Sequence, residues 1–489
     1  MISSLGILNL FSIVFSIAFQ IILVRFFGAA SQTDVYYLTI NIIQFVFTIH
    51  IGFITDLYIP IYNDIKTRSM EDCQKFTGGV LLMITLTSLL ISVLVAFAAL
   101  PITRLFATGF SAENIYFAAR MVQILSLTIF FNSITMFLNA TLNANFFLSI
   151  TYISNAIPPL FNLMSLLFLA KSYGMIAIIY SLAIASMLNF IILFAFFILK
   201  IEWKVTNPFT QPDIKYLLKK NLPIRAGVWI YHLQAPITSN VLSYFPIGYI
   251  TLFNYASSIL SVLLRLITTS TIQVLHVNIS NLLALHKLDE AKSFLISTIK
   301  NNVTLFMCLL MPTVILFKEI CRLILFPRVT LDQISIMFNL FLALSPLYFI
   351  LSMETPFVTT TLVMKNGKKM IHAAAVFILY YGICLIMTLS FLKVYALPVA
   401  LLFAQMQSII IYARFVQKKL QVIEIKMTKL ILFCIIFMML MIAINLIISD
   451  NSYFTIILNS LLIFAWFISA RKEIKISFQF MMKKNLIKK

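Results

Sequence analysis

The chain has 489 residues, of which 61% are hydrophobic and 11% charged, and its mean hydropathy is +1.01. A water-soluble domain cannot bury that much apolar surface, because too large a part of any folded chain stays exposed. The net charge of +20 would suggest nucleic acid for a soluble protein, but most Lys and Arg residues lie in short gaps between apolar runs. We therefore expect a membrane protein with no nucleic-acid partner.

Apolar runs long enough to cross a bilayer follow one another along the chain. A spanning helix needs roughly 20 mostly apolar residues, and helices are expected because the backbone in lipid must satisfy its own hydrogen bonds. The alternation of a β-barrel is absent. The predicted helices, about fourteen, cover residues 5–27, 35–62, 79–103, 115–139, 146–170, 174–199, 221–245, 249–280, 301–325, 331–362, 371–392, 395–417, 427–449 and 452–470.

The distribution of basic residues orients these helices. Lys and Arg are enriched in the cytoplasmic loops of membrane proteins. Of the 36 Lys and Arg residues, 26 lie in alternate gaps, at the adjoining helix ends and in the tail on one side, 7 lie on the other side, and the remaining 3 lie deeper inside predicted helices. We therefore predict a multi-pass protein of the bacterial inner membrane with both termini in the cytoplasm.

The longest polar insertion divides the chain. Residues 200–220 hold two prolines and five lysines and are predicted to be a cytoplasmic linker. It separates an N-lobe, residues 1–199, from a C-lobe, residues 221–420. Two further helices are predicted within 421–470. The basic tail, residues 471–489, is expected to be either an interfacial helix on anionic lipid or a frayed end.

A faint internal repeat relates the two lobes. Residues 23–38 resemble 241–256, and residues 141–185 resemble 360–405. Six predicted helices separate the copies, an even number, so both copies have the same orientation. Parallel repeats about an axis along the membrane normal are typical of transporters, with the substrate path between them. The predicted fold is all-α, with two six-helix lobes in a parallel pseudo-two-fold repeat plus two C-terminal helices.

Polar residues recur at steps of three or four in two predicted helices, which places them on one helix face. Around the helix 35–62 they are Asp34, Tyr37, Asn41, Gln44 and Thr48. In the helix 249–280 they are Asn254, Ser258, Ser261, Arg265 and Thr268. Polar groups inside a membrane are costly and tend to face a cavity. Because the two helices occupy equivalent places in the repeat, we predict that both stripes line a central aqueous cavity.

Basic residues inside the predicted helices are candidates for binding an anion. The guanidinium groups of Arg225 and Arg265 stay charged and fork onto phosphate oxygens. Arg120 lies one turn from Gln123 in another helix and is a third candidate. Two alternatives stay open: Arg225 could reach the cytoplasmic headgroups, and Asp34 could lie at the outer interface.

Two carboxylates are candidates for a proton or cation site, because a buried carboxylate can titrate near neutral pH. Glu354 precedes Pro356 in a long helix, and Asp56 lies near the cytoplasmic end of its helix, where a solvated structural role is the alternative.

The five cysteines form no CxxC motif, so neither a metal site nor a disulfide framework is predicted. The chain carries no P-loop, GxSxG or HExxH motif. We therefore expect no enzyme and no cofactor, with a coupling cation or the membrane potential as energy source.

The first loop resembles a known family. The stretch FFGAASQTDVYYL, followed by a long helix and GFITDLYIPIYND, is similar to the opening of the MviN/MurJ lipid II flippases. The matching residues are Phe27, Gly28, Ala29, Thr33, Asp34, Gly52 and Pro60. Residues 141–185 resemble the fifth and sixth helices of that family. It belongs to the multidrug/oligosaccharidyl-lipid/polysaccharide exporter superfamily, whose two-lobed design agrees with the repeat.

The resemblance implies a flippase that moves a polyprenyl-pyrophosphate-linked saccharide by alternating access. The positions at which family members carry arginines are occupied here by Ile13, Phe19, Gln20, Phe47 and Ser258. Arg225, Arg265 and Arg120 are then the candidates for binding the pyrophosphate, and an O-antigen or exopolysaccharide unit is an alternative to lipid II. A cation-coupled multidrug antiporter of the same superfamily is the other alternative. The expected partners are a lipid-linked glycan and membrane lipids, with the protein a monomer.

Overall fold

The computed structural model describes residues 2–55, 58–364, 366–420, 428–447, 452–471 and 474–475. Most of these residues are helical, and none of them lies in a strand. Eight helices in this part of the chain are long and apolar enough, by length and composition, to cross a membrane. The chain is therefore an all-α, multi-pass membrane protein, which confirms the predicted fold class.

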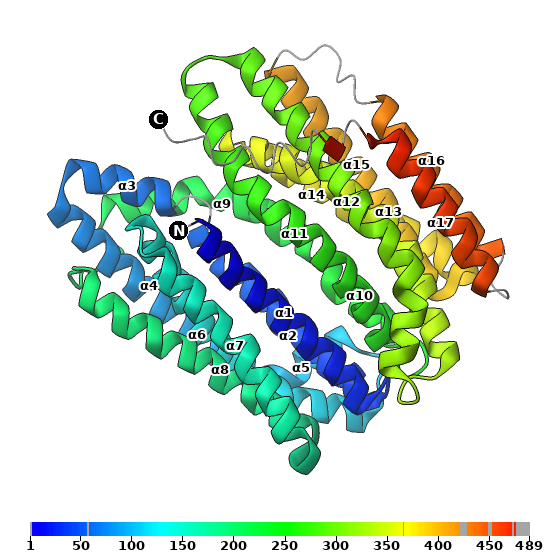
Figure 1. Ribbon diagram of the computed structural model, residues 1–489. Helices are drawn as coiled ribbons and strands as arrows, with labels where there is room; N and C mark the ends of the chain where they lie inside the picture. The colour runs from blue at the N-terminus through cyan, green and yellow to red at the C-terminus, as the bar shows by residue number, and fades with distance from the viewer. Residues whose placement is uncertain are drawn as a thin grey trace. The chain divides into compact units, whose positions relative to one another are not determined.

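The helices follow the predicted ranges closely (Figure 1). The first ten are α1 (Ile2–Phe27), α2 (Ser31–Thr55), α3 (Tyr58–Arg68), α4 (Met70–Phe97), α5 (Ala99–Phe106), α6 (Ala112–Ala144), α7 (Leu148–Phe168), α8 (Ala170–Lys200), α9 (Pro212–His232) and α10 (Gln234–Leu242). The others are α11 (Tyr249–Ala284), α12 (Leu288–Leu325), α13 (Leu331–Val363), α14 (Gly367–Leu392), the short 3₁₀ turn η1 (Lys393–Tyr395), α15 (Ala396–Lys419), α16 (Thr428–Ile447) and α17 (Ser452–Ser469).

The predicted range 35–62 is divided between α2 and α3. Two further helices that were predicted to be continuous are broken ahead of a proline. The predicted range 79–103 divides at Ala98, before Pro101, and the range 221–245 divides at Leu233, before Pro236. A proline inside a helix lacks the N–H for a backbone bond and clashes with the carbonyl four residues earlier, whereas the first turn of a helix tolerates it. Starting a new helix two residues before the proline places it in the first turn and avoids both costs.

The helix starts repeat along the chain with a nearly constant shift. Four pairs of helices begin 218 or 219 residues apart, at Ser31 and Tyr249, Met70 and Leu288, Ala112 and Leu331, and Leu148 and Gly367. The helices α6 and α13 even share the same length of 33 residues. In both, a hydroxyl side chain, Ser111 or Thr330, caps the first turn. The helix pattern therefore repeats along the chain with nearly the shift that the sequence predicted.

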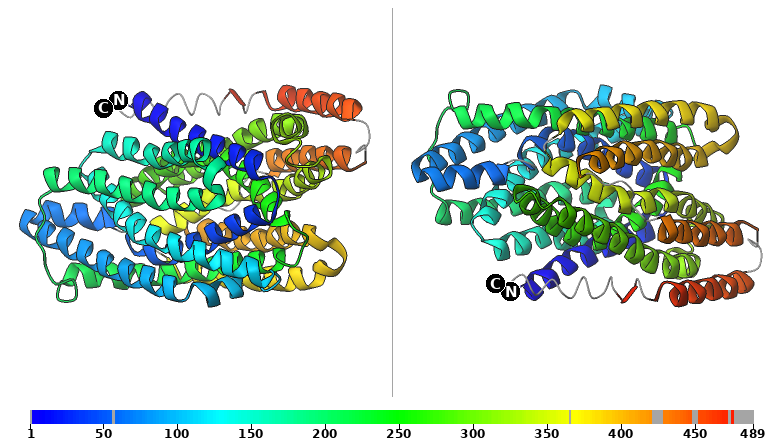
Figure 2. Two further views of the ribbon diagram at one scale, coloured as in Figure 1. Left: turned by 90° about the horizontal axis from the view of Figure 1, so that it is seen from below. Right: turned by 90° about the horizontal axis from the view of Figure 1, so that it is seen from above.

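The chain forms two compact units. The first consists of Met1–Thr251 with Pro327–Val329, and the second of Leu252–Phe326 with Thr330–Lys489. In the first unit, α6 packs against α4 and α8, and α7 packs against α8. The second unit repeats this pattern, with α13 against α12 and α15, and α14 against α15. The helices α16 and α17, drawn in orange and red, form an antiparallel pair (Figures 1 and 2).

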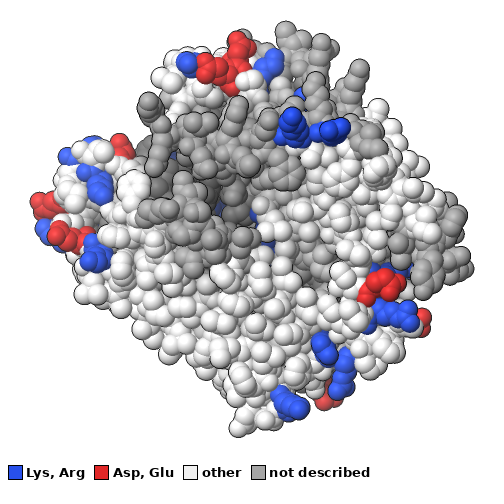
Figure 3. Space-filling model, viewed as in Figure 1, with Lys and Arg blue, Asp and Glu red and all other residues white. Residues whose placement is uncertain are grey.

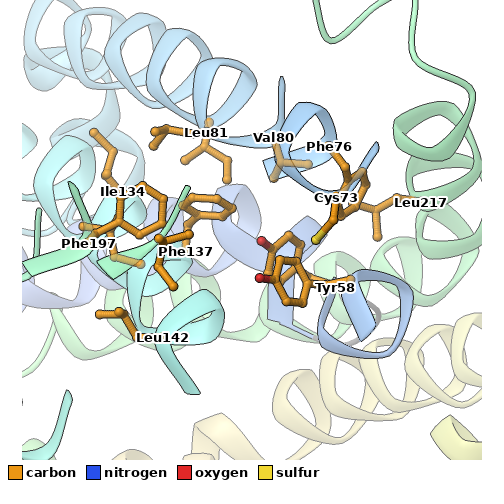
Figure 4. Packing of buried hydrophobic residues seen from close by; sticks show 14 of the residues in the cluster. Tyr58, Cys73, Phe76, Val80, Leu81, Ile134, Phe137, Leu142, Phe197 and Leu217 are labelled. Atoms are coloured by element: carbon orange, nitrogen blue, oxygen red, sulfur yellow. The ribbon is translucent and has the colours of Figure 1, made fainter. Parts of the chain in front are cut away.

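An aromatic core holds α3 against α4, α6 and α8 within the first unit (Figure 4). The ring of Tyr58 stacks on Phe76 with centroids 5.7 Å apart and meets Phe137 edge-on at 5.3 Å. Its hydroxyl lies 2.9 Å from that of Thr141, so the one polar atom of this buried ring is satisfied. Aromatic side chains contribute much to a core because each buries a large area.

The predicted linker is bound to α4. The backbone N–H of Lys204 donates to the carbonyl of Gln74 at 3.1 Å, and the Thr206 hydroxyl donates to the carbonyl of Lys75 at 2.6 Å. Gly78 makes this close approach possible, because a Cβ there would lie 2.0 Å from the carbonyl oxygen of Lys204. The helix α9 then begins at Pro212, inside the range that we expected to be a linker. Residues 200–220 thus lie within the first unit, and a lobe division at this segment stays a prediction.

The surface of the first unit suits a bilayer. Along α7 and α8 the visible face is uncharged, and charged residues gather at the ends of these helices (Figure 3). Large apolar side chains such as Leu160, Leu167, Ile184 and Ile191 are exposed there. Lipid favours this arrangement, whereas in water such a surface would drive aggregation. The predicted interfacial helix of the tail lies largely outside the described residues.

We predict that Gly78→Ala lowers the free energy of unfolding by about 1–3 kcal/mol, because overpacking against a backbone forces the neighbouring segment to move. Gly382→Ala is the matched control, since a Cβ at Gly382 would meet no atom within 4 Å. Thermal unfolding of both purified variants in the same detergent measures the difference. Equal stability of the two variants and the wild type would contradict the tight docking of 201–211 on α4.

Candidate functional site

The carboxylate of Asp34 is buried, with 3% of its surface exposed. Its Oδ2 accepts a hydrogen bond from the backbone N–H of Gly248 at 2.6 Å. Its Oδ1 accepts from the backbone N–H of Thr251 at 2.8 Å and from the Thr251 hydroxyl at 2.6 Å. The first N–H groups of a helix have no partner within that helix, and they favour negative charge. Asp34 at the start of α2 therefore caps the start of α11.

Two glycines bring three chain connections together around this cap. Gly28 has a φ of +69°, and a Cβ there would lie 2.6 Å from the carbonyl oxygen of Arg328. Gly248 has a φ of +98°, and its Cβ would lie 2.6 Å from the carbonyl oxygen of Ala29. Only glycine combines a positive φ with such a close backbone approach at little cost. The FFGAASQTD stretch is thus a packing motif of the first unit, with Asp34 as its charged member.

The polar stripe of α2 divides into two parts. Asp34 is enclosed by the start of α11, whereas Asn41 is half-buried and Gln44 is exposed, one turn before Thr48. Further along, the indole N–H of Trp229 on α9 donates to the carbonyl of Ile49 at 2.8 Å. The predicted stripe therefore has a structural end and a more open end.

Arg225 lies on α9 within the first unit, with 5% of its surface exposed. Its guanidinium acts electrostatically on His232, two turns along the same helix. A cation so deeply buried in a membrane protein marks a functional site unless other groups satisfy it. The alternative that Arg225 reaches the cytoplasmic lipid headgroups stays a prediction.

The stripe of α11 carries the second cation. Arg265 is exposed, and Asn254, Ser258 and Ser261 are half-buried on the same helix. The Ser261 hydroxyl donates to the carbonyl of Ser258 at 2.9 Å. Arg265 also acts electrostatically on Tyr348 of α13, whose hydroxyl lies 2.7 Å from that of Ser257. These residues belong to the second unit, whereas Arg225 and Arg120 belong to the first.

The remaining predicted residues fall in different places. Arg120 is exposed on α6, and Asp56 lies outside the described residues. Glu354 on α13 has 4% of its surface exposed. Its carboxylate accepts hydrogen bonds from the Gln405 amide and, at 2.7 Å, from the Ser408 hydroxyl, both on α15. Within the described part of the chain, no group of three or more His, Cys, Asp or Glu side chains could hold a metal ion.

Comparison with known proteins assigns the family. The sequence model of the family described as "Lipid II flippase MurJ" matches residues 23–465. The chain belongs to the lipid II flippase MurJ family. No curated protein sequence matches this MurJ-family chain.

Solved structures share the fold of this MurJ-family protein. A structure of the lipid II flippase MurJ in an inward closed conformation has a TM-score of 0.72 and 20% identity, covering 99% of both chains. An inward-facing multidrug resistance MATE family transporter has a TM-score of 0.69 and 12% identity, covering 85% of this chain and 96% of its own. The Vibrio cholerae MATE transporter VcmN in its bent form has a TM-score of 0.58 and 13% identity, covering 86% and 96%.

Sequence reasoning missed the partners of the two carboxylates in this MurJ-family protein. Gln405 and Ser408 lie three residues apart after an apolar first part of α15, which is a detectable signal for one polar face. Thr251 stands at the place in the second repeat that Thr33 occupies in the first. Neither signal reveals which carboxylate each residue binds, because the partners are far apart in the chain.

We predict that Asp34→Ala lowers the free energy of unfolding by about 2–3 kcal/mol, because hydrogen bonds to a charged group are strong and the α11 donors would lose their acceptor. Asp34→Asn keeps one acceptor oxygen and should cost less. Asp64→Asn is the control, since Asp64 is an exposed partner of Arg68 at 3.3 Å and such pairs contribute little. Chemical or thermal unfolding in detergent measures all three, and an unchanged Asp34→Ala variant would refute the capping role.

Proposed function

We propose that this protein is a flippase that moves a polyprenyl-pyrophosphate-linked saccharide, lipid II or a related cell-envelope precursor, across the bacterial inner membrane. The observation that carries this proposal is the family match over residues 23–465. The absence of a catalytic motif in the sequence supports transport rather than catalysis. Alternating access between the two repeats is the mechanism that parallel repeats support.

The two basic residues supply the chemistry for the anionic headgroup. Arg265 on α11 is exposed and Arg225 on α9 is buried, and a guanidinium can fork onto two phosphate oxygens at once. Hydroxyl and amide groups at Asn254, Ser258 and Ser261, together with Asn41 and Gln44, suit the saccharide because they both donate and accept. The lipid tail stays in the membrane, which the apolar outer faces of the helices permit.

Two alternatives have specific support. The MATE likeness and the buried Glu354 favour a cation-coupled multidrug antiporter. The loss of arginines from the positions that the family resemblance indicates favours a different saccharide, such as an O-antigen or exopolysaccharide unit. The flippase proposal has the stronger support, because the family model covers most of the chain.

A depletion strain tests the proposal. We expect the wild-type gene to restore growth of cells that lack their own lipid II flippase, and Arg265→Ala to lose this rescue because the pyrophosphate would lose its bidentate partner. Arg265→Lys should rescue partly. Arg414→Ala, which changes an exposed arginine of α15, is the matched control, with membrane levels compared by immunoblot.

The other outcomes of this test are informative. Rescue of a polysaccharide-exporter mutant without rescue of the depletion strain would move the substrate to another glycan. Dye efflux without either rescue would favour the antiporter. Full rescue by Arg265→Ala would remove this arginine from the proposed binding site.

The orientation of the chain can be tested separately. We propose that both termini lie in the cytoplasm, because basic residues concentrate on that side of the membrane. We also propose that the protein is a monomer. Alkaline phosphatase fused after Lys393, between α14 and α15, should be active, whereas phosphatase fused after Arg68, between α3 and α4, should be inactive. A green fluorescent protein fused at the C-terminus should fluoresce. Reversed phosphatase activities would overturn the orientation.

A further inference from the structure

Glu354 occupies a polar position inside the second unit that the flippase proposal does not use. Its two oxygens accept hydrogen bonds from Gln405 and Ser408, one helical turn apart on α15. Among the described residues, no salt bridge includes Glu354. An unpaired buried charge is costly in a medium of low dielectric constant, and protonation removes that cost.

The partners of Glu354 can serve both forms of the carboxyl group. A Ser hydroxyl can donate or accept, and a Gln amide can present its N–H or, after rotation, its oxygen. When a proton binds, the new O–H can donate to either partner, so neither form leaves a buried group unsatisfied. Asp34 differs, because two of its three hydrogen bonds come from the backbone N–H groups of Gly248 and Thr251, which can only donate. These donors favour the anionic form of Asp34, whereas both partners of Glu354 can serve either form of its carboxyl group.

The repeat supplies an internal comparison. Because α6 and α13 have the same length and start 219 residues apart, at Ala112 and Leu331, Thr135 is the counterpart of Glu354. Thr135 is also buried, and α6 packs against α8 as α13 packs against α15. The fold therefore tolerates an uncharged residue at this place. Burying a carboxylate costs free energy, and the packing of the repeat does not explain why only one copy carries an acid here.

The charged surroundings of Glu354 are sparse. On α15 the phenol of Tyr412 interacts with it electrostatically. On α12 the amide of Asn302 faces α13 and donates to the carbonyl of Ser352 at 3.4 Å. On α11 the cation Arg265 acts on Tyr348. Within the described residues, the side chains that bind the carboxyl directly are thus Gln405 and Ser408.

We propose that Glu354, held between Gln405 and Ser408, is a proton-binding site that takes up and releases a proton during the transport cycle. Uptake converts the carboxylate to a carboxylic acid, and release returns the proton to water. The link to the transport cycle rests on the proposed function, whereas proton binding itself does not.

Infrared difference spectroscopy of the purified full-length protein tests proton binding without any substrate. A protonated carboxyl absorbs apart from a carboxylate, so the wild type should gain a buried-carboxyl band as the pH is lowered. Glu354→Gln should lose this band at every pH. Glu319→Gln, which removes an exposed carboxylate of the same unit, should keep it. The band unchanged in Glu354→Gln, or absent from the wild type throughout the titration, would overturn the proposal.

A second variant keeps the test valid if Glu354→Gln does not fold. Ser408→Ala retains the carboxyl but removes one of its hydrogen bonds, so the band should remain and move in frequency. An unmoved band would show that the titrating group lies elsewhere and would overturn the assignment.

Reconstituted vesicles that contain a polyprenyl-pyrophosphate-linked saccharide test the coupling. A pH gradient should accelerate flipping by the wild type, and Glu354→Gln should lose this acceleration. No flipping by the wild type, with the infrared band present, would refute the proposed function and leave the proton site standing. Flipping in both proteins with equal acceleration would refute the coupling.

Discussion

The structure depends on one constraint, which is that a polar group buried in a membrane protein must find its partner within the protein. The two buried carboxylates meet it differently. Asp34 binds the free N–H groups at the start of α11 and so joins two helices that begin at equivalent places in the repeat. Glu354 binds two side chains on the neighbouring helix α15. Backbone N–H groups can only donate and so favour a charged carboxylate, whereas side chains that can also accept serve its neutral form as well.

The helices and their repeat could be predicted because they follow from local rules. Apolar length marks the spans, and the same shift that relates the sequence stretches relates the helix starts. The breaks at Ala98 and Leu233 were missed, although Pro101 and Pro236 stand three residues later and account for them. The docking of residues 201–211 on α4 could not be predicted, since Gly78 in an apolar helix does not show which segment it contacts.

The candidate site was harder to predict than the fold. Periodicity predicted one face of α2 for Asp34, Asn41 and Gln44, but a helix face does not stay in one environment along its length. Near the start of α2 that face meets the backbone of α11, and further along Gln44 is exposed. The partners of Glu354 lie 51 and 54 residues away in the chain, and only tertiary packing brings them together.

The fold and the substrate are specified by different parts of this sequence. A helix in lipid requires apolar outer residues and a few close contacts, so the MurJ fold persists at 20% identity. Substrate recognition depends instead on a small number of charged groups, since each costs free energy inside a membrane and is retained only where it has a use. The candidate arginines for this role are Arg120, Arg225 and Arg265. We expect the positions of these arginines, more than the shared fold, to determine which anionic headgroup this transporter can bind.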